Sequence, residues 1–358
     1  MVKTTTNKNL VIIVLILIIL VNFTCCLQDD EKNNDKNHEK DDDDISDLAL
    51  KEFIEKVENV TASTLVWAES LDVDPVKLRQ EMGIKGKKKY VELLDIYFGL
   101  YETTDEPLKK EEYRKTVEEL ANFTKDPNYH DLNEINDTQF REDSTSYLRA
   151  WYILNEFGLN TTYYLTEIEK ILPRLNDHLP SRGINQKMAF VFYYHKLGYE
   201  IEYTMENLFN NSVIRSRILP ENLSELRIYH ITHEIFFLYE EHLMDILSND
   251  DINYLKNVLR YQVNFTISEN NVDLLAELIM IMHYLDFFEL EEYEIALNYL
   301  FSSQNKNGTF GDYEYVRNYF KEIGSPIDVD IYLYLHTTEV SIRALNEAVY
   351  FKKNNSAG

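Results

Sequence analysis

Apolar and polar positions follow three successive patterns along the chain. Residues 10–21 are an unbroken apolar run, and residues 29–44 are charged or amide side chains almost throughout. From Ile45 onward, apolar residues recur at the three- and four-residue spacing of amphipathic helices. Strand-like alternation between turn residues is rare, and Gly and Pro number only 10 and 7. The pattern predicts an all-α protein, with one helical domain over residues 45–353 and a tail over residues 354–358.

The helical pattern is most regular in the second half of the chain. Short connections separate its helices, so neighbours should pack antiparallel as helical hairpins. The hairpins recur about every 40 to 50 residues, a spacing typical both of helical arrays and of closed helical rings. An α/α toroid and an open helical array are therefore the two expected architectures. The helices expected there span residues 144–157, 166–177, 185–197, 204–211, 222–247, 250–263, 271–284, 290–303, 313–323 and 328–350.

The N-terminal residues have the features of a secretory signal peptide. Two lysines accompany the apolar run, which at 12 residues is shorter than the ~20 that a membrane-spanning helix needs. We predict a signal peptide over residues 1–26 and an acidic disordered segment over residues 27–44. An uncleaved membrane anchor is the alternative; after cleavage, no stable membrane span would remain. Cys25 and Cys26, the only two cysteines, lie at the expected cleavage zone, so the mature chain would have no framework of disulfides. Its stability should therefore come from burial of an apolar core.

Glycosylation sequons support the same route. Nine N-x-S/T sequons follow the signal peptide, where the Asn, Ser and Thr content alone would give about three or four. We therefore predict a eukaryotic glycoprotein that is secreted to the extracellular space or held in the lumen of the secretory pathway. The sequon asparagines are Asn59, Asn122, Asn136, Asn160, Asn210, Asn222, Asn264, Asn307 and Asn354.

The charge balance excludes one class of partner. The formal net charge is −26 and the isoelectric point is about 4.7. Nucleic acids and anionic membranes are bound through Lys and Arg, so we expect no nucleic-acid partner. The chain also has no nucleophile elbow, no P-loop and no dinucleotide-binding glycine pattern. A small molecule, a glycan or another protein remains as the ligand.

One loop resembles a known superfamily. Residues Gln304 to Gly311 read Gln-Asn-Lys-Asn-Gly-Thr-Phe-Gly, similar to the Gln-x-x-x-Gly-x-Phe loops of the terpenoid-cyclase and protein-prenyltransferase superfamily. There, such a loop leads from an outer to an inner helix of an α/α toroid. The segment from His336 to Leu345 also resembles an inner helix of those repeats. The resemblance implies a fold and no activity, because the Asp-rich motif of the cyclases and the Cys and His zinc set of the prenyltransferases are absent.

The helix expected over residues 222–247 contains a histidine pair. His230 and His233 lie one turn apart on an apolar face, and Glu234 follows four residues after His230. Such a group can bind a metal or move protons, so His230 and His233 are candidate ligands of a divalent metal. The spacing differs from that of the H-E-x-x-H zinc motif. Core histidines hydrogen-bonded to neighbouring helices are the alternative interpretation.

Glu277 stands out in the helix expected over residues 271–284. That helix is apolar nearly all round, and Asp273 and Glu277 are its only charged residues. Asp273 is explained by the preference of acids for the first helical turn. A buried lone carboxylate, by contrast, must be paired, hydrogen-bonded or neutral. Glu277 is therefore either a general acid facing a cavity or a structural partner of an Arg or His.

The last long helix adds two candidates. His336 and Glu339 share one face with Arg343, although Glu339 and Arg343, four residues apart, could instead pair with each other. If the helices over 222–247, 271–284 and 328–350 lie in the same layer, these polar residues would converge on one interior space. The candidate catalytic residues are therefore Glu277, His230, His233, Glu234, His336 and Glu339.

Two functions are compatible with this convergence. The first is an enzyme that uses the His and Glu cluster for acid–base or metal-assisted chemistry on a small molecule, glycan or peptide. The second is a non-catalytic secreted binding or interaction protein. A cavity lined by ionisable groups would favour the enzyme, and a closed apolar centre would favour the binding protein.

Overall fold

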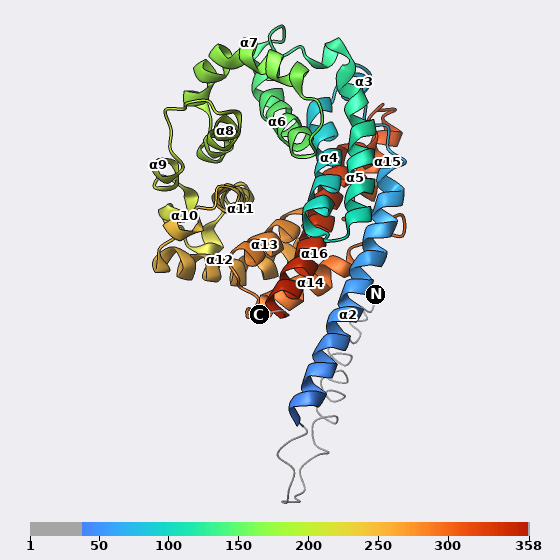
Figure 1. Ribbon diagram of the computed structural model, residues 1–358, viewed down its shortest axis with the longest axis vertical. Helices are drawn as coiled ribbons and strands as arrows, with labels where there is room; N and C mark the ends of the chain where they lie inside the picture. Colours follow the sequence, from blue (N-terminus) through green and yellow to red (C-terminus); the bar gives the residue numbers. More distant parts are fainter. Residues whose placement is uncertain (1–37, 357–358) are drawn as a thin grey trace, which may run out of the picture. The chain divides into compact units, whose positions relative to one another are not determined.

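The computed structural model describes residues 38–356 (Figure 1). The chain forms two compact units, residues 1–49 and 50–358, and the second covers nearly the same residues as the predicted helical domain. The described residues contain no strand, and one isolated bridge pairs Gln304 with Phe310. The prediction of an all-α fold is confirmed.

The helices have the following bounds. In chain order they are α2 (His38–Ala68), α3 (Pro75–Met82), α4 (Gly86–Thr103), α5 (Pro107–Leu120), α6 (Asp137–Glu156), α7 (Thr162–His178), α8 (Ile184–Leu197), α9 (Met205–Phe209), α10 (Val213–Ser216), α11 (Glu225–Glu240), α12 (Asn249–Ser268), α13 (Val272–Tyr284), α14 (Glu291–Ser302), α15 (Glu314–Glu322) and α16 (Leu335–Ser356). A π-helical turn, η6 (Asp330–Tyr334), leads into α16, and short 3₁₀ turns join several of the others.

The two ends of the described chain are more helical than expected. Helix α2 begins at His38, so residues 38–44 of the predicted disordered segment are helical. Acidic residues favour the N-terminal turns of a helix, which explains how this stretch joins α2. Helix α16 continues to Ser356, into the predicted tail, after two lysines whose charge suits a helix C-terminus. The predicted signal peptide and residues 27–37 lie outside the described residues.

Helix boundaries follow local capping chemistry. Asp74 is the N-cap of α3, and its carboxylate accepts hydrogen bonds from the backbone N–H groups of Val76 and Lys77. Pro75 then occupies the first helical position, where the missing N–H has no cost. At the other end, Gly83 ends α3 in the left-handed conformation, at φ +65°. Helix α4 can therefore start at Gly86 and carry its N-terminal residues toward the site described below.

Six helices of the second unit contact one another in succession. Helix α4 packs on α6, α6 on α8, α8 on α11, α11 on α13 and α13 on α16, and α16 packs back against α4. Other helices pack on this set: α3 and α5 on α4, α7 on α6, and α12 and α14 on α13. Helices α11, α13 and α16, which carry the candidate residues, are therefore neighbours, as the sequence pattern required.

The loop after α14 fixes two distant helices to each other. The Gln304 side-chain amide donates to the Val60 carbonyl at 3.0 Å and to the Ser63 hydroxyl at 2.9 Å, both in α2. The backbone N–H of Phe310 donates to the Thr338 hydroxyl of α16 at 3.0 Å. The buried Phe310 ring anchors the loop in the core. The loop thereby holds the start of α16 in place.

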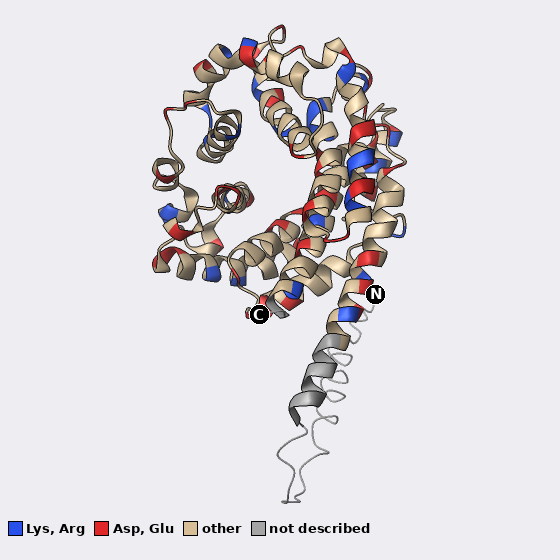
Figure 2. Ribbon diagram, viewed as in Figure 1, with Lys and Arg blue, Asp and Glu red and all other residues tan. Residues whose placement is uncertain are grey.

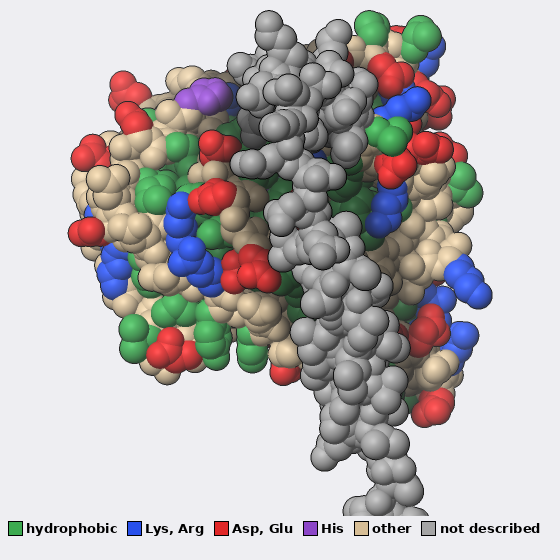
Figure 3. Space-filling view, turned by 90° about the horizontal axis from the view of Figure 1, so that it is seen from below, with side chains coloured by type: hydrophobic (Ala, Val, Ile, Leu, Met, Phe, Trp, Pro, Cys, Tyr) green, Lys and Arg blue, Asp and Glu red, His purple; other side chains and the backbone are tan. Residues whose placement is uncertain are grey.

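Charges of both signs are mixed over the surface. Figure 2 shows Lys and Arg interspersed with Asp and Glu on the described helices, for example along α5. The face in Figure 3 likewise presents acidic, basic and apolar side chains together. Within residues 38–356, no helix combines the length and the apolar character needed to cross a membrane.

Candidate metal centre and its cavity

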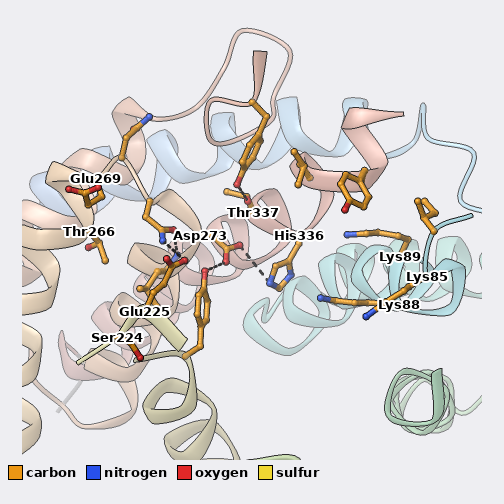
Figure 4. Close-up of a pocket in the computed structure, with 18 of the residues that line it drawn as sticks. Lys85, Lys88, Lys89, Ser224, Glu225, Thr266, Glu269, Asp273, His336 and Thr337 are labelled. Atoms are coloured by element: carbon orange, nitrogen blue, oxygen red, sulfur yellow. Dashed lines mark hydrogen bonds and ion pairs between the residues drawn. The ribbon is translucent and has the colours of Figure 1, made fainter. Parts of the chain in front are cut away.

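One cavity of the described chain lies where four helices begin. It has a volume of about 1050 Å³ and is lined by N-terminal residues of α4, α11, α13 and α16 (Figure 4). The C-terminal residues of the same four helices line a second cavity of about 500 Å³, so the four helices run in the same direction. Ligand sites in proteins commonly have volumes of about 300–1000 Å³. The larger cavity is therefore wide enough for a small-molecule ligand.

Asp273 reaches this cavity from the first turn of α13. Its Oδ2 accepts a hydrogen bond from the Tyr229 hydroxyl of α11 at 2.5 Å. Its Oδ1 is buried and has no hydrogen-bond partner in residues 38–356. That oxygen lies 3.6 Å from Nε2 of His336, beyond hydrogen-bond length. Two ligands that each lie about 2.1 Å from one metal ion are roughly 3 to 4 Å apart, so this separation suits a shared ion.

Glu277 lies one turn further along α13, behind Asp273. Its side chain is only 2% exposed. The Thr232 hydroxyl of α11 donates a hydrogen bond to Oε2 of Glu277. Burial and the neighbouring Asp273 raise the pKa of the Glu277 carboxyl, while the Thr232 hydrogen bond and His336 act against that rise. The Thr232 hydroxyl thus holds one oxygen of the carboxyl. A nearby cation would favour the ionised form of the carboxyl, which burial disfavours.

His336 is the second residue of α16. It follows the π-helical turn η6, a geometry common near functional sites. Its Nδ1 lies 3.4 Å from Oε2 of Glu339 and 3.7 Å from Oε1 of Glu92. Burial alone would lower the pKa of His336, but the carboxylates of Asp273, Glu339 and Glu92 raise it to about 10. Without a metal, the imidazole therefore carries a second proton at neutral pH.

Asp273, Glu277 and His336 together offer three ligand atoms that lie within 4.8 Å of one another. Hydroxyls of α11 hold the two carboxylates, Tyr229 one oxygen of Asp273 and Thr232 one oxygen of Glu277, and the Glu339 carboxylate lies 3.4 Å from Nδ1 of the imidazole. Outer groups of this kind orient metal ligands and set the histidine tautomer. One imidazole and two carboxylates suit ions such as Zn²⁺, Mn²⁺ or Fe²⁺. Three protein ligands leave positions open for water or substrate, as in catalytic sites.

The structure brings together most of the residues that the sequence analysis singled out. Glu277 and Glu339 are buried, and the half-buried His336 lies between them in one cluster. His233 is adjacent, because its Nδ1 lies 3.8 Å from Oε2 of Glu277. That Nδ1 lies 2.7 Å from the Tyr229 carbonyl, so it carries the proton that donates to this oxygen. Of the residues predicted to converge on one interior space, the structure therefore brings these four together.

The predicted metal ligands differ from those that the geometry offers. The three-residue metal group contains neither His230 nor His233. His230 has no hydrogen bond or ion pair within residues 38–356, and His233 uses its Nδ1 proton within its own helix. The i, i+3 spacing therefore places both histidines on one face of the helix, but it does not arrange them as ligands of the same metal ion. The candidate ligand among the histidines is His336 instead.

Glu234 lies outside this cluster. Its buried carboxylate accepts hydrogen bonds from the backbone N–H groups of Val213, at 2.9 Å, and Ile214, at 3.2 Å. Successive residues of a helix are turned by about 100° from each other, which points Glu234 away from the face that holds Thr232 and His233. It satisfies the first N–H groups of α10, so the prediction that Glu234 converges with the other candidate residues is wrong.

Sequence reasoning missed three residues of the site. Asp273 was explained as a helix-start acid, although its spacing of four from Glu277 in an apolar helix was a usable signal. Tyr229 and Thr232 are uncharged, and their hydroxyls gave no signal in a chain with 26 tyrosines. Each of them acts through a carboxylate of another helix, which only the packing of α11 on α13 reveals.

The chain matches one protein-family model over residues 84–344, that of a domain of unknown function (DUF6895). The match includes all of the candidate metal ligands and the residues that orient them. No curated protein and no solved structure matches the chain.

Proposed function

The chain belongs to the DUF6895 family, and we propose that it is a divalent-metal-dependent enzyme acting on a small polar molecule in the cavity at the start of α4, α11, α13 and α16. One observation carries the proposal. Asp273, Glu277 and His336 converge beside the cavity, which Asp273 and His336 line, and a hydroxyl of α11 holds each of the two carboxylates. Ligands oriented by such outer partners are a property of metal sites.

The residues present would supply metal-assisted hydrolysis. Asp273 Oδ1, a Glu277 oxygen and His336 Nε2 would hold the ion, and binding it would release the second proton of His336. A bound Zn²⁺ lowers the pKa of its water to about 7, which generates a hydroxide at neutral pH. The chemistry supplied would be hydrolysis, in which one water molecule is added across the cleaved bond: its oxygen goes to the electrophilic atom of the substrate and its proton to the leaving group.

Metal content tests this proposal. Purified protein is incubated with Zn²⁺ or Mn²⁺, desalted, and measured by inductively coupled plasma mass spectrometry. We expect about one ion per chain for the wild type and a loss of it in Asp273→Asn and His336→Gln. His230→Gln is the matched control, because His230 makes no hydrogen bond or ion pair within residues 38–356, and it should retain the ion. Wild-type protein without bound metal would favour the alternative of a non-catalytic binding protein.

The helix arrangement proposed here is an α/α toroid. Its support is the closed succession of contacts from α4 through α6, α8, α11 and α13 to α16 and back to α4. The loop from Gln304 to Gly311 adds support, because it leads from α14 toward α16 while pinned to α2. A solved structure in which α16 does not pack on α4 would require the open array instead.

We also propose that the protein is a secreted glycoprotein. All nine sequon asparagines are exposed, so a glycan could be attached at each of them without burying it. Expression in animal cells should deliver the protein to the medium, and removal of N-glycans should lower its mass on a gel. Retention in the cytosol with no mass shift would refute the proposal.

A further inference from the structure

Charges of opposite sign line the two sides of the cavity at the metal centre. Figure 4 shows Lys85, Lys88 and Lys89 on one side and Glu225 and Glu269 on the other, with Asp273 and His336 between them. We infer that the substrate is a small zwitterion, with an anionic group toward the lysines and a protonated amine toward the glutamates, as in a short peptide with free ends. The inference rests on the proposed enzymatic function and specifies its substrate class.

The lysine side retains positive charge after its internal pairs are counted. Lys88 and Lys89 share a single carboxylate, Glu92, at 3.5 Å and 2.6 Å. Lys85 pairs with Glu142, another cavity residue, at 3.3 Å. Two ammonium groups against one carboxylate leave a net positive charge, and about half of the Lys88 side chain is exposed toward solvent and the cavity. An anionic ligand group could therefore bind Lys88 without breaking a buried ion pair.

The two glutamates on the other side form no ion pair with any cation of the described residues. Glu225 accepts a hydrogen bond from the Asn271 side-chain amide at 3.1 Å, which leaves its charge in place. Neither Glu225 nor Glu269 forms an ion pair within residues 38–356. A ligand ammonium would supply the missing positive charge.

A ligand with one charge meets the wrong sign on one side of the cavity. Like charges repel, and an unpaired charged wall has to be desolvated when a ligand covers it. A molecule with both charges satisfies both walls at once, and its middle would then lie beside Asp273 and His336. In a short peptide with free ends, that middle is an amide bond, which metal-bound hydroxide can hydrolyse.

Capped dipeptides separate the contribution of the ligand's ammonium group from that of its carboxylate group. We would titrate the full secreted chain with L-alanyl-L-alanine, its N-acetyl form and its C-terminal amide by isothermal titration calorimetry. The free dipeptide should bind at least about tenfold more tightly than either capped form, since each cap removes one charge-assisted interaction. Equal binding of the three peptides, or no binding of the free dipeptide at millimolar concentration, would overturn the inference.

Charge-removing variants assign each end of the ligand to its wall. Lys88→Met should weaken binding of the free and acetylated peptides about tenfold and leave the amide unaffected. Glu225→Gln with Glu269→Gln should weaken the free and amidated peptides and leave the acetylated one unaffected. Lys115→Met on α5 and Glu206→Gln on α9, both exposed and outside the cavity, are the controls. Variants that weaken all three peptides alike would contradict the assignment.

Repeating the titrations in EDTA separates this inference from the proposed function. Charge-selective binding that persists in EDTA, in a protein that holds no metal in the metal-content assay, would support the zwitterion site and refute the metal enzyme. Stoichiometric metal with no preference among the three peptides would refute the zwitterion site and leave the metal centre standing.

Discussion

Replacing Glu234 with glutamine should change how the stability of the protein depends on pH. The Glu234 side chain is 1% exposed, and its carboxylate accepts two backbone N–H groups at the start of α10. Burial raises the pKa of this carboxyl to about 7, against the smaller opposing effect of the two hydrogen bonds. Glutamine has nearly the same shape and retains one oxygen acceptor, but it cannot ionise.

The sign and size of the effect follow from proton linkage. Between the ordinary pKa of 4.5 and the folded-state pKa of about 7, the folded protein binds more protons than the unfolded protein. The stability that the protonated Glu234 carboxyl contributes is therefore fully present below the ordinary pKa, and it is lost as the pH rises through about 7. Integrated from pH 5.5 to pH 8.5, the loss for this one group is about 2 kcal/mol. Glu234→Gln lacks that loss.

The assay is urea unfolding at both pH values, followed by circular dichroism. We expect Glu234→Gln to gain about 2 kcal/mol relative to the wild type between pH 5.5 and pH 8.5, with other titrating groups cancelling in the comparison. Glu206→Gln, an exposed position on α9, is the control and should follow the wild type. A difference between Glu234→Gln and the wild type that is the same at both pH values would refute the raised pKa and the buried capping role.

Three further substitutions test other parts of the structure. Thr232→Val removes the hydroxyl that holds Glu277 and should weaken Zn²⁺ binding about 10- to 100-fold in a chelator competition, whereas Thr266→Val, whose hydroxyl bonds only its own helix, should not. Gly308→Ala should lower the free energy of unfolding in urea by more than about 1 kcal/mol, because the φ of Gly308 is +92° and a Cβ there would lie 2.3 Å from the Ser63 carbonyl oxygen. Gly183→Ala is the matched control, because Gly183 has an ordinary φ and a Cβ there would meet no atom closer than 3.4 Å. Arg343→Met leaves Glu347 without its 2.8 Å partner and should cost about 3–5 kcal/mol, with partial recovery in the double variant Arg343→Met/Glu347→Gln.

The sequence predicted the fold class and most helices because their signals are local. The helix expected over residues 185–197 is an example, because α8 ends at Leu197, where Gly198 adopts the left-handed conformation at φ +73°. The helix expected over residues 222–247 instead ends at Glu240. His242 adopts a left-handed conformation, at φ +57°, and the N–H of Leu243 turns back to the Leu238 carbonyl. This is the helix stop that glycine usually signals, and a histidine in its place gives no sign of it in the sequence.

The sequence predicted a site residue only where a charged side chain had to be buried and therefore needed polar partners. Glu277 is an isolated carboxylate in an apolar helix, so its need for polar partners follows from the sequence alone. The identity of those partners does not, because helical periodicity gives the face of a residue but not the helix that covers it. For the same reason, the sequence does not show that the Glu234 carboxylate contacts the start of α10. It also explains Arg343, which pairs with Glu347 rather than with Glu339.

The two polar clusters on α16 differ in a way that favours a ligand at the first. Near the middle of the helix, Arg343 closes directly on Glu347 at 2.8 Å and on the Tyr284 hydroxyl at 3.1 Å. At the start of the helix, His336 is surrounded by carboxylates at 3.4 to 3.7 Å and makes no hydrogen bond with any of them.

Buried opposite charges that are free to approach each other gain several kcal/mol by closing to hydrogen-bond distance. Around His336, Asp273 is instead held by the Tyr229 hydroxyl and Glu92 by the Lys89 ammonium, and Glu277, one turn further along α13, is held by the Thr232 hydroxyl. The separation that results is too long for hydrogen bonds and suits ligands around an ion. The hydroxyls of α11 therefore stabilise an open arrangement at the cost of direct pairing, which a divalent cation would offset.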